Sequence, residues 1–346
     1  MRLARVSAIA LGLLLGADLA SAQPASLAAR MSTADAASEH WDLSARFESG
    51  HALVARFQIT NEGPGQHTAV AIGHLLFPDG KRSSFHNGRT RNKWELRDDG
   101  FLLDVGSSEL GLRGPRRSYD VSKSGDGVEI HLVIQSSGAS SLASQTGLGG
   151  YGLRVVDVAA PIEGSIWIRE REMAEPLLVR GRASLVHTWV DERESAVALR
   201  RIDVASLGAD GAFVLVDLAT PAGKSLRWLA LERGGRIVYE TGDLEVDLAD
   251  PTAGPRGGKY PVPGFLHFHN ASVDGKVELG RILLSNNPMQ YLPQPFRFLL
   301  SLRTRPRRAW TESAFELKLQ AGSDRSAWQA RGDGIASVTY LNPPKS

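Results

Sequence analysis

The sequence predicts an all-β protein that contains two antiparallel β-barrels packed side by side. From about residue 50 onward, short segments that alternate between apolar and polar residues, or are apolar throughout, follow one another. Turn sequences separate these segments, and the 36 glycines and 17 prolines are spread along the chain, as expected for many short strands. Because 346 residues exceed the size that one core usually serves, we expect two barrels.

The N-terminus predicts an exported protein. Arg2 and Arg5 precede an apolar run over residues 6–15, and Ala20-Ser21-Ala22 forms a small-residue cleavage site. We therefore expect residues 1–22 to be a signal peptide, and the protein to be periplasmic or secreted. The sequence has no cysteine, so its stability has to come from the cores without disulfides.

The composition argues against nucleic acid as a partner. The chain has 40 Lys and Arg against 38 Asp and Glu, a net charge of +2, and no basic segment alternates with aromatic residues. The glycine-rich segment 136–152 does not follow a strand and open a helix in phosphate-binding order. No nucleotide and no other cofactor is therefore predicted.

The first barrel is predicted over residues 38–175, after a polar, alanine-rich lead. Typical turn sequences such as NEGPGQ, FPDGK and KSGDG separate its strands. The expected strands are ALVARFQIT (52–60), TAVAIGHLLF (68–77), FLLDVG (101–106), VEIHLVIQ (128–135), YGLRVVDV (151–158) and GSIWIRE (164–170).

The second barrel is predicted over residues 176–346, with the boundary at REMAEPLLVRG. A similar series of segments recurs here: RASLVHTWV, VALRRIDVAS, AFVLVDLAT, LRWLALERGG, RIVYETGDLEVDL, GFLHFHNASV, VELGRILLS, FRFLLSLRT, AFELKLQ and IASVTYL. Barrels of about eight strands can hold one small ligand inside.

His187 is the candidate catalytic residue. It lies in GRASLVHTWVDER (181–193), where Ala183, Leu185, His187 and Trp189 share one face of a strand. If this face lines a lumen, the imidazole either orients a ligand and transfers protons, or is a core histidine with one hydrogen-bond partner. Leu185 and Trp189 are candidate ligand-binding residues for the same reason.

Three further aromatic residues are candidates for lining the same cavity or a neighbouring one. They are Trp167, Trp228 and Tyr239. Ordinary core packing is the alternative interpretation of all three.

His267 and His269 share a strand face in FLHFHN, a spacing that can offer two nitrogen ligands to a metal. The sequence shows no segment rich in Cys or His that supplies a third or fourth ligand. Two ligands alone specify little, so no metal site is predicted.

A basic segment near the C-terminus carries Arg297, Arg303, Arg305, Arg307 and Arg308. One interpretation is a basic rim that contacts anionic lipid headgroups at a membrane surface, with Met289 and Tyr291 beside it. The other is a solvated strand end, which is ordinary in soluble proteins.

Several segments together resemble the two-domain lipocalin-like (calycin) proteins. This group includes carotenoid hydratases, fungal lipocalin-like Diels–Alderases and ceramide-carrying survival-factor proteins. The resemblance covers about residues 38–342 and rests on Trp41 with FESGHALVARFQITNEGPG, then GYGLRVVDVAAPIEGSIWI, GRASLVHTWVDE, FVLVDLATPAGKS, LALERGGRIVYETGD and WQARGDGIASVTYL. It implies two lipocalin-like barrels and a hydrophobic small-molecule ligand.

The sequence departs from the hydratase pattern at one position that matters for catalysis. The resemblance implies that the hydratases carry the motif Asp-His-Asn-Trp-Gly in the strand that opens the second domain. At the same place this chain has Val186-His187-Thr188-Trp189-Val190. The resemblance assigns the acid role to the missing Asp, and a histidine with an ordinary pKa of about 6.5 is a weak acid for protonating an alkene. We therefore expect a carrier of a lipid or isoprenoid, with a hydratase, cyclase or isomerase as the alternative. A third class is a structural or partner-binding envelope protein whose barrels are filled by side chains.

Overall fold

The computed structural model describes residues 27–62, 66–123, 127–136, 144–145, 148–169, 175–208, 210–252, 260–291, 297–298, 301, 304–322 and 327–342. Within these ranges, apolar residues at every second position give long strands with one buried face. The expected signal peptide, residues 1–22, lies outside them.

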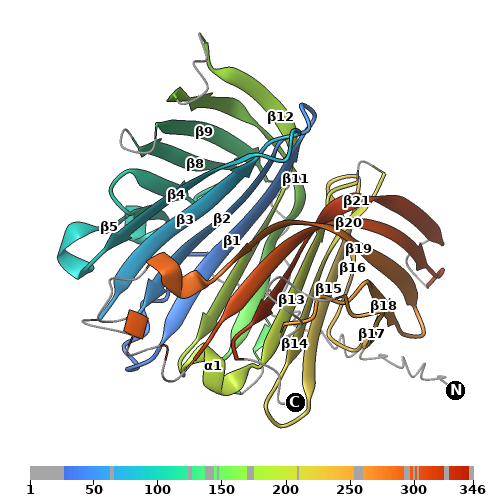
Figure 1. Ribbon diagram of the computed structural model, residues 1–346. Coiled ribbons are helices and arrows are strands. Elements are labelled where there is room, and N and C mark those ends of the chain that lie inside the picture. Colours follow the sequence, from blue (N-terminus) through green and yellow to red (C-terminus); the bar gives the residue numbers. More distant parts are fainter. Residues whose placement is uncertain are drawn as a thin grey trace, which may run out of the picture.

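The strands form two antiparallel sheets, which lie side by side and curl into half-barrels (Figure 1). The strands of the first sheet are β1 (Ser38–Phe47), β2 (Ala52–Thr60), β3 (Thr68–Leu76), β4 (Arg82–Arg89), β5 (Glu95–Arg97), β6 (Leu102–Asp104), β7 (Ser108–Gly111), β8 (Arg116–Lys123), β9 (Val128–Gln135), β10 (Ser144–Gln145), β11 (Gly152–Ile168) and β12 (Leu177–Val190). Those of the second are β13 (Arg200–Ser206), β14 (Ala212–Ala219), β15 (Ser225–Arg233), β16 (Arg236–Thr241), β17 (Glu245–Ala249), β18 (Phe265–His269), β19 (Val273–Asn286), β20 (Arg307–Leu319) and β21 (Trp328–Tyr340).

Helical structure is limited to short pieces within the described ranges. They include η1 (Arg91–Lys93), η2 (Asp98–Gly100), α1 (Glu194–Val197) and η4 (Pro288–Tyr291), and residues 297, 298 and 301 are also helical. Among the described residues, no helix has the length and apolar composition needed to cross a bilayer. The prediction of an all-β protein with two lipocalin-like barrels is confirmed.

Both sheets have the same order of connections. The first runs β4-β3-β2-β1-β12-β11-β9-β8-β7-β6-β5, and the second runs β16-β15-β14-β13-β21-β20-β19-β18-β17. In each sheet, the first four strands of the sequence form a meander. The strand that comes last in the sequence, β12 or β21, lies beside the first strand of that meander, β1 or β13, and on its other side pairs with the strand that precedes it in the sequence, β11 or β20. This shared topology is what duplication of one ancestral sheet predicts.

The change from one sheet to the other falls later in the sequence than expected. β12, which the sequence analysis assigned to the second barrel, pairs with β1 and β11 of the first sheet. The second sheet begins only with β13, so the division falls between Val190 and Arg200 and not near residue 175. The pattern of apolar residues along β12 is compatible with either sheet, so periodicity alone could not assign this strand.

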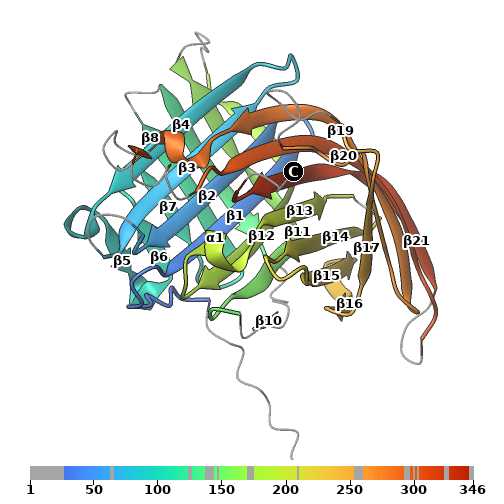
Figure 2. The same cartoon turned by 60° about the horizontal axis from the view of Figure 1, so that its bottom comes forward.

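Each half-barrel has its own apolar core, and a third and a fourth apolar cluster join the two sheets. Side chains such as Leu53 and Ile130 fill the first sheet's inner face, and Phe213 and Phe268 fill that of the second. Between the sheets, β11 and β12 pack against β13–β15, while Val54 of β2 shares a cluster with Trp310 of β20. Figure 2 shows β19 and β20 running past β2 and β3 at this second contact.

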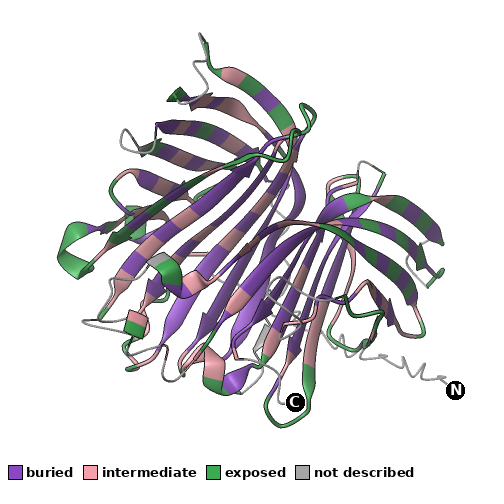
Figure 3. Cartoon of the chain, in the orientation of Figure 1, coloured by how far each residue is buried: buried purple, intermediate pink, exposed green. Residues whose placement is uncertain are grey.

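The burial pattern separates interface strands from outer ones (Figure 3). The first nine residues of β11 are all buried, because one of their faces meets the core and the other meets the second sheet. The N-terminal half of β21 and the C-terminal half of β20 instead alternate between buried and exposed residues. The two sheets therefore pack through their outer faces where both faces of a strand are buried, and the alternating parts of β20 and β21 lie outside this contact.

Candidate functional site

His187 lies on the inner face of the first half-barrel, as the strand periodicity predicts. Leu185 beside it is fully buried in the core of the first sheet. The imidazole stacks on the indole of Trp41 from β1, with ring centroids 4.6 Å apart and planes 7° from parallel. The indole of Trp189 lies on its other flank, with ring centroids 5.1 Å apart. The histidine is thus held between two tryptophans.

Glu39 supplies the polar partner of this histidine. The Nε2 atom of His187 lies 2.7 Å from Oε1 of Glu39, and the two side chains are 2% and 7% exposed. Burial lowers the pKa of His187 below its ordinary value, although the hydrogen bond to Glu39 acts in the opposite direction. The imidazole is therefore neutral at neutral pH, and its Nε2–H donates to the carboxylate.

An N-terminal strap, residues 27–37, covers this pair. The backbone N–H groups of Arg30 and Met31 donate to the Glu39 carboxylate at 2.9 and 3.2 Å. The Arg30 guanidinium lies over the Trp189 ring, 4.8 Å from its centroid. The side-chain amide of Asn61 fastens the strap by donating to the carbonyls of Ser32 and Ala34, at 2.9 and 2.8 Å.

A small recess lies where the strap meets the half-barrel. Its walls include Arg30, Met31, Glu39, Asn61, His67 and Trp189. Its volume of about 10 Å³ is enough for about one water molecule. The Nε1–H groups of Trp41 and Trp189 are buried and have no hydrogen-bond partner among the described residues. Glu39 and Trp189 line the recess themselves, and His187 contacts both of them without lining it. Aromatic surface with a few polar groups is the composition of a small-molecule site.

Gly152 allows the Trp189 indole to lie where it does. Gly152 of β11 is the cross-strand neighbour of Trp189. A methyl group at this glycine would overlap Cε2, Cζ2 and Nε1 of the indole. The close approach, and not an unusual backbone conformation, requires glycine here.

The structure brings together only part of the set predicted from the sequence. Leu185, His187 and Trp189 lie on one face, as expected. Trp167 points away from the core, because its neighbours Ile166 and Ile168 are the buried ones, and the Arg169 guanidinium lies 5.5 Å from its ring centroid.

Trp228 and Tyr239 also lie away from His187, in the second sheet. Trp228 packs against the apolar cluster between the sheets. Tyr239 packs against the core of the second half-barrel, and its hydroxyl lies 3.4 Å from Oδ1 of Asn270. These aromatic residues therefore do not lie beside His187, and Trp228 and Tyr239 pack against apolar clusters as the alternative interpretation has it. Lining of a neighbouring cavity stays a prediction.

A second group of buried polar side chains lies between the sheets. Asp42 of β1 receives two hydrogen bonds of 2.7 Å from Arg56 of β2 and two, of 3.3 and 3.4 Å, from Arg308 of β20. Burial alone would raise the pKa of Asp42, but Arg56 and Arg308 hold it well below its ordinary value. The carboxylate is therefore ionised and bridges the two sheets.

Arg201 of β13 makes the matching contacts from the second sheet. Its guanidinium lies 2.7 Å from the Asp203 carboxylate. It also donates to the Thr188 hydroxyl at 3.0 Å and to the Tyr151 hydroxyl at 3.1 Å, both in the first half of the molecule. Charged side chains of both sheets meet in this cluster, with Arg308 of the second sheet contacting Asp42 of the first, so we assign it to the interface and not to the ligand site.

Arg308 belongs neither to a basic rim nor to a solvated strand end, the two interpretations of the basic segment. Its side chain is 8% exposed and pairs with Asp42 inside the interface. Arg303 lies outside the described residues. A contact of the remaining arginines with membrane lipids stays a prediction.

Neither a family model nor a curated protein sequence matches the chain. Solved structures of similar fold include the following three. An AttH protein of Nitrosomonas europaea has a TM-score of 0.63 at 13% identity, covering 88% of this chain and 92% of its own. CghA bound to Sch210972 has a TM-score of 0.60 at 13% identity, covering 89% of each chain. Kievitone hydratase from Nectria haematococca has a TM-score of 0.58 at 11% identity, covering 88% of this chain and 89% of its own. The chain therefore shares with these proteins the two-barrel lipocalin-like fold.

Proposed function

We propose that the protein binds a hydrophobic small molecule, a lipid or an isoprenoid, at the end of the first half-barrel. The observation that carries this proposal is the buried His187–Glu39 pair between the indoles of Trp41 and Trp189. Small-molecule sites are mostly apolar and contain a few polar groups at fixed positions. The two indole N–H groups without partners among the described residues offer further donors to a ligand oxygen.

Binding requires the strap to move. The recess has a volume of about 10 Å³, which is room for about one water molecule. A ligand pocket usually has a volume of about 300–1,000 Å³, which is far larger. The strap contacts both Glu39 and Trp189, so its release would uncover the polar pair and the aromatic surface together. A ligand would replace the strap's contacts, with its polar end toward His187.

A second candidate function is acid–base catalysis on such a ligand, as a hydratase, cyclase or isomerase. Glu39 favours it, because this carboxylate stands beside the imidazole although Val186 replaces the acid expected from the hydratase pattern. His187 would accept or deliver a proton, and Glu39 would stabilise the imidazolium. The indole faces of Trp41 and Trp189 would stabilise a cationic intermediate. The proteins of similar fold include a hydratase and CghA, a Diels–Alderase, which supports chemistry on a bound small molecule.

We also propose export, on the strength of residues 1–22. N-terminal sequencing of the protein purified from its native host tests this proposal. A mature chain that begins at Gln23 would support it, and a chain that retains Met1 and the apolar run would contradict it.

The test of the binding function is native mass spectrometry of the purified protein, followed by organic extraction of whatever it carries. We expect one lipid or isoprenoid per chain. Trp189→Leu should reduce the bound fraction by about tenfold or more, because it removes one aromatic wall. Trp167→Leu is the matched control, since this tryptophan lies on the outer face and should keep its ligand.

Two results would contradict the binding proposal. One is a protein that is purified without ligand and takes up nothing from a lipid extract, and the other is an equal loss of bound ligand in the two tryptophan variants.

The extracted compound then serves as a trial substrate for the test of catalysis. Turnover that His187→Gln abolishes while binding is only weakened would support catalysis. Recovery of the compound unchanged from the wild-type protein would contradict catalysis and support the carrier function.

A further inference from the structure

The outer face of the second sheet gathers two histidines and three carboxylates on neighbouring strands. His267 and His269 are two residues apart on β18, on the face opposite the buried Leu266 and Phe268. Sequence reasoning found this pair but no third ligand. Pairing of β18 with β17 places Asp247 directly opposite His267.

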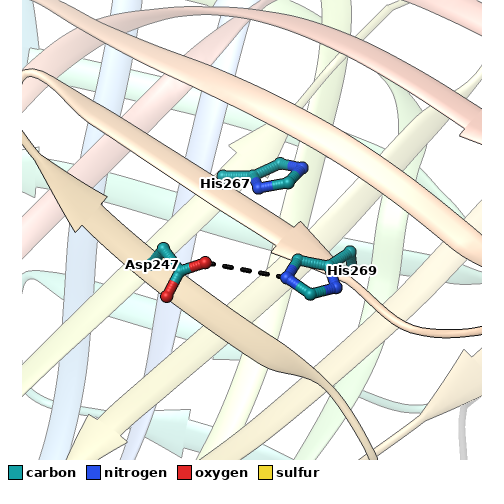
Figure 4. Close-up of side chains that lie close together, drawn as sticks. All are labelled: Asp247, His267 and His269. Carbon is teal, nitrogen blue, oxygen red and sulfur yellow. Dashed lines mark ion pairs between the residues drawn. The ribbon is translucent and has the colours of Figure 1, made fainter.

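We propose that His267, His269 and Asp247 form a binding site for a divalent late transition-metal cation such as Zn²⁺ or Cu²⁺ (Figure 4). One ligand atom from each of the three side chains lies within 4.8 Å of the others. The Nε2 atom of His269 and Oδ2 of Asp247 are 3.6 Å apart. Two ligands of a tetrahedral Zn²⁺, each at about 2.1 Å from the metal, are about 3.4 Å apart, so small side-chain rotations complete the geometry.

The charges around this cluster favour a cation. Glu245 lies 3.8 Å from Nε2 of His269, and Asp274 of β19 lies 3.6 Å from Nε2 of His267. Asp274 can accept a hydrogen bond from Nε2–H of His267 when Nδ1 of that ring binds the metal, which orients the ring. Glu245 instead approaches the same Nε2 of His269 as Asp247 does, so it adds a negative charge beside the metal. Lys276, the cross-strand neighbour of His267 on β19, turns its ammonium group over the Phe265 ring, 4.2 Å from the centroid.

The ligand types select the class of ion. Imidazole nitrogens suit Zn²⁺, Cu²⁺ and Ni²⁺, whereas Mg²⁺ and Ca²⁺ take oxygen ligands almost exclusively. Three protein ligands leave at least one coordination position for water. The metal site lies in the second sheet, whereas His187 lies in the first. The metal proposal is therefore independent of the proposed ligand site.

Metal binding would also fasten an edge of the sheet. β17 is the last strand in the order of the second sheet and has only five residues. A cation held by Asp247 of β17 and by both histidines of β18 links the edge strand to its neighbour. A ligand that binds only the folded state stabilises it, so saturating Zn²⁺ should raise the unfolding temperature.

Isothermal titration of the untagged, full-length protein with Zn²⁺ tests the proposal. We expect one Zn²⁺ per chain, at an affinity that excess Mg²⁺ and Ca²⁺ leave unchanged. His269→Gln and Asp247→Asn should each weaken binding by about tenfold or more. The matched control is His131→Gln: this exposed histidine has one carboxylate neighbour, Asp120 at 3.0 Å, but no second histidine within its strand. Its loss should leave Zn²⁺ affinity unchanged.

Copper provides an independent measurement. The electron paramagnetic resonance spectrum of one equivalent of Cu²⁺ should show coupling to two nitrogen nuclei in the wild-type protein and to one in His267→Gln. Both histidines are partly exposed, so these variants keep the fold, which circular dichroism verifies. Unchanged Zn²⁺ affinity in the His269 variant, or a Cu²⁺ spectrum that His267→Gln does not alter, would overturn the assignment.

Discussion

The imidazole of His187 and the carboxylate of Glu39 lie 2.7 Å apart, although 148 positions separate the two residues in the sequence. The contact exists because β12 pairs antiparallel with β1, which places Trp189 opposite Glu39 and His187 opposite Trp41. The same pairing assembles the polar pair and both aromatic walls in one step. Loss of this register would therefore remove the whole candidate site.

The two members of this pair should depend on each other energetically. His187→Gln or Glu39→Gln alone leaves a buried partner poorly satisfied, which costs about 1–3 kcal/mol of unfolding free energy. The double variant should cost less than the sum of the single ones, since no partner is then stranded. Urea unfolding of the four proteins measures this coupling. Additive losses would mean that the two side chains do not interact in solution.

Gly152→Ala should disturb Trp189 specifically. The added methyl group overlaps the indole, so the ring has to shift, and overpacking of this kind costs about 1–3 kcal/mol. Gly88→Ala is the control, because a methyl group on this strand glycine meets no atom within 4 Å. Tryptophan fluorescence and urea unfolding report the effect. Equal behaviour of the two variants would contradict the close approach at Gly152.

Asn61→Ala should loosen the strap. The variant removes both hydrogen bonds from the amide to the carbonyls of Ser32 and Ala34. If the strap has to leave before a ligand enters, the rate of ligand uptake from lipid vesicles should rise, and protection of the strap amides against hydrogen exchange should fall. A rise in exchange without faster uptake would show that ligand enters by another route.

His74 should make the protein sensitive to mild acid. Burial, and next the charge of Arg82, lowers the pKa of His74 to about 4 in the folded protein, against about 6.5 in an unfolded chain. The stabilisation from the neutral imidazole is therefore complete above about pH 6.5 and declines as the pH falls toward 4, by about 1.4 kcal/mol per pH unit. His40 and His187 shift in the same direction.

His74→Gln removes one of these contributions. Urea unfolding between about pH 6.5 and pH 4 should show that the unfolding free energy of the variant falls less steeply with pH than that of the wild-type protein. The difference in slope should correspond to the uptake of about one proton. Identical slopes would mean that His74 titrates in the folded protein as it does in the unfolded chain.

Asp42→Asn should weaken the contact between the sheets. The substitution leaves Arg56 and Arg308 buried without their counter-charge, and breaking a buried pair in this way costs about 3–5 kcal/mol. Glu312→Gln, which removes the exposed pair with Arg281, should leave stability unchanged within error. A small effect of Asp42→Asn would show that water reaches the cluster.

The strand periodicity was enough to predict the class of fold and one face of the site. Alternation by two residues assigns Leu185, His187 and Trp189 to one side of a strand regardless of what that strand pairs with. The same rule, applied to Ile166 and Ile168, would have placed Trp167 on the opposite side from the core. That error came from treating aromatic character as evidence for a cavity.

The partners of these residues could not be predicted in the same way. Glu39 and Asp247 reach their histidines across strand pairs, and a sequence does not state locally which strands become neighbours. One signal for Glu39 was present, since it precedes Trp41 by two residues and so places a carboxylate on an apolar face. The volume of the recess depends on how the strap packs, which no periodicity encodes.

The position of the last strand in each sheet has a consequence for synthesis of the chain. β12 and β21 are made last but lie in the middle, between β1 and β11 and between β13 and β20. Until each has left the ribosome, its two neighbours expose unpaired edges, which are prone to aggregate, and the long-range pairing that follows is slow. A nascent chain that stops before Trp328 would thus be open through the centre of its second sheet, whereas a simple meander cut at the same place would lose only an edge.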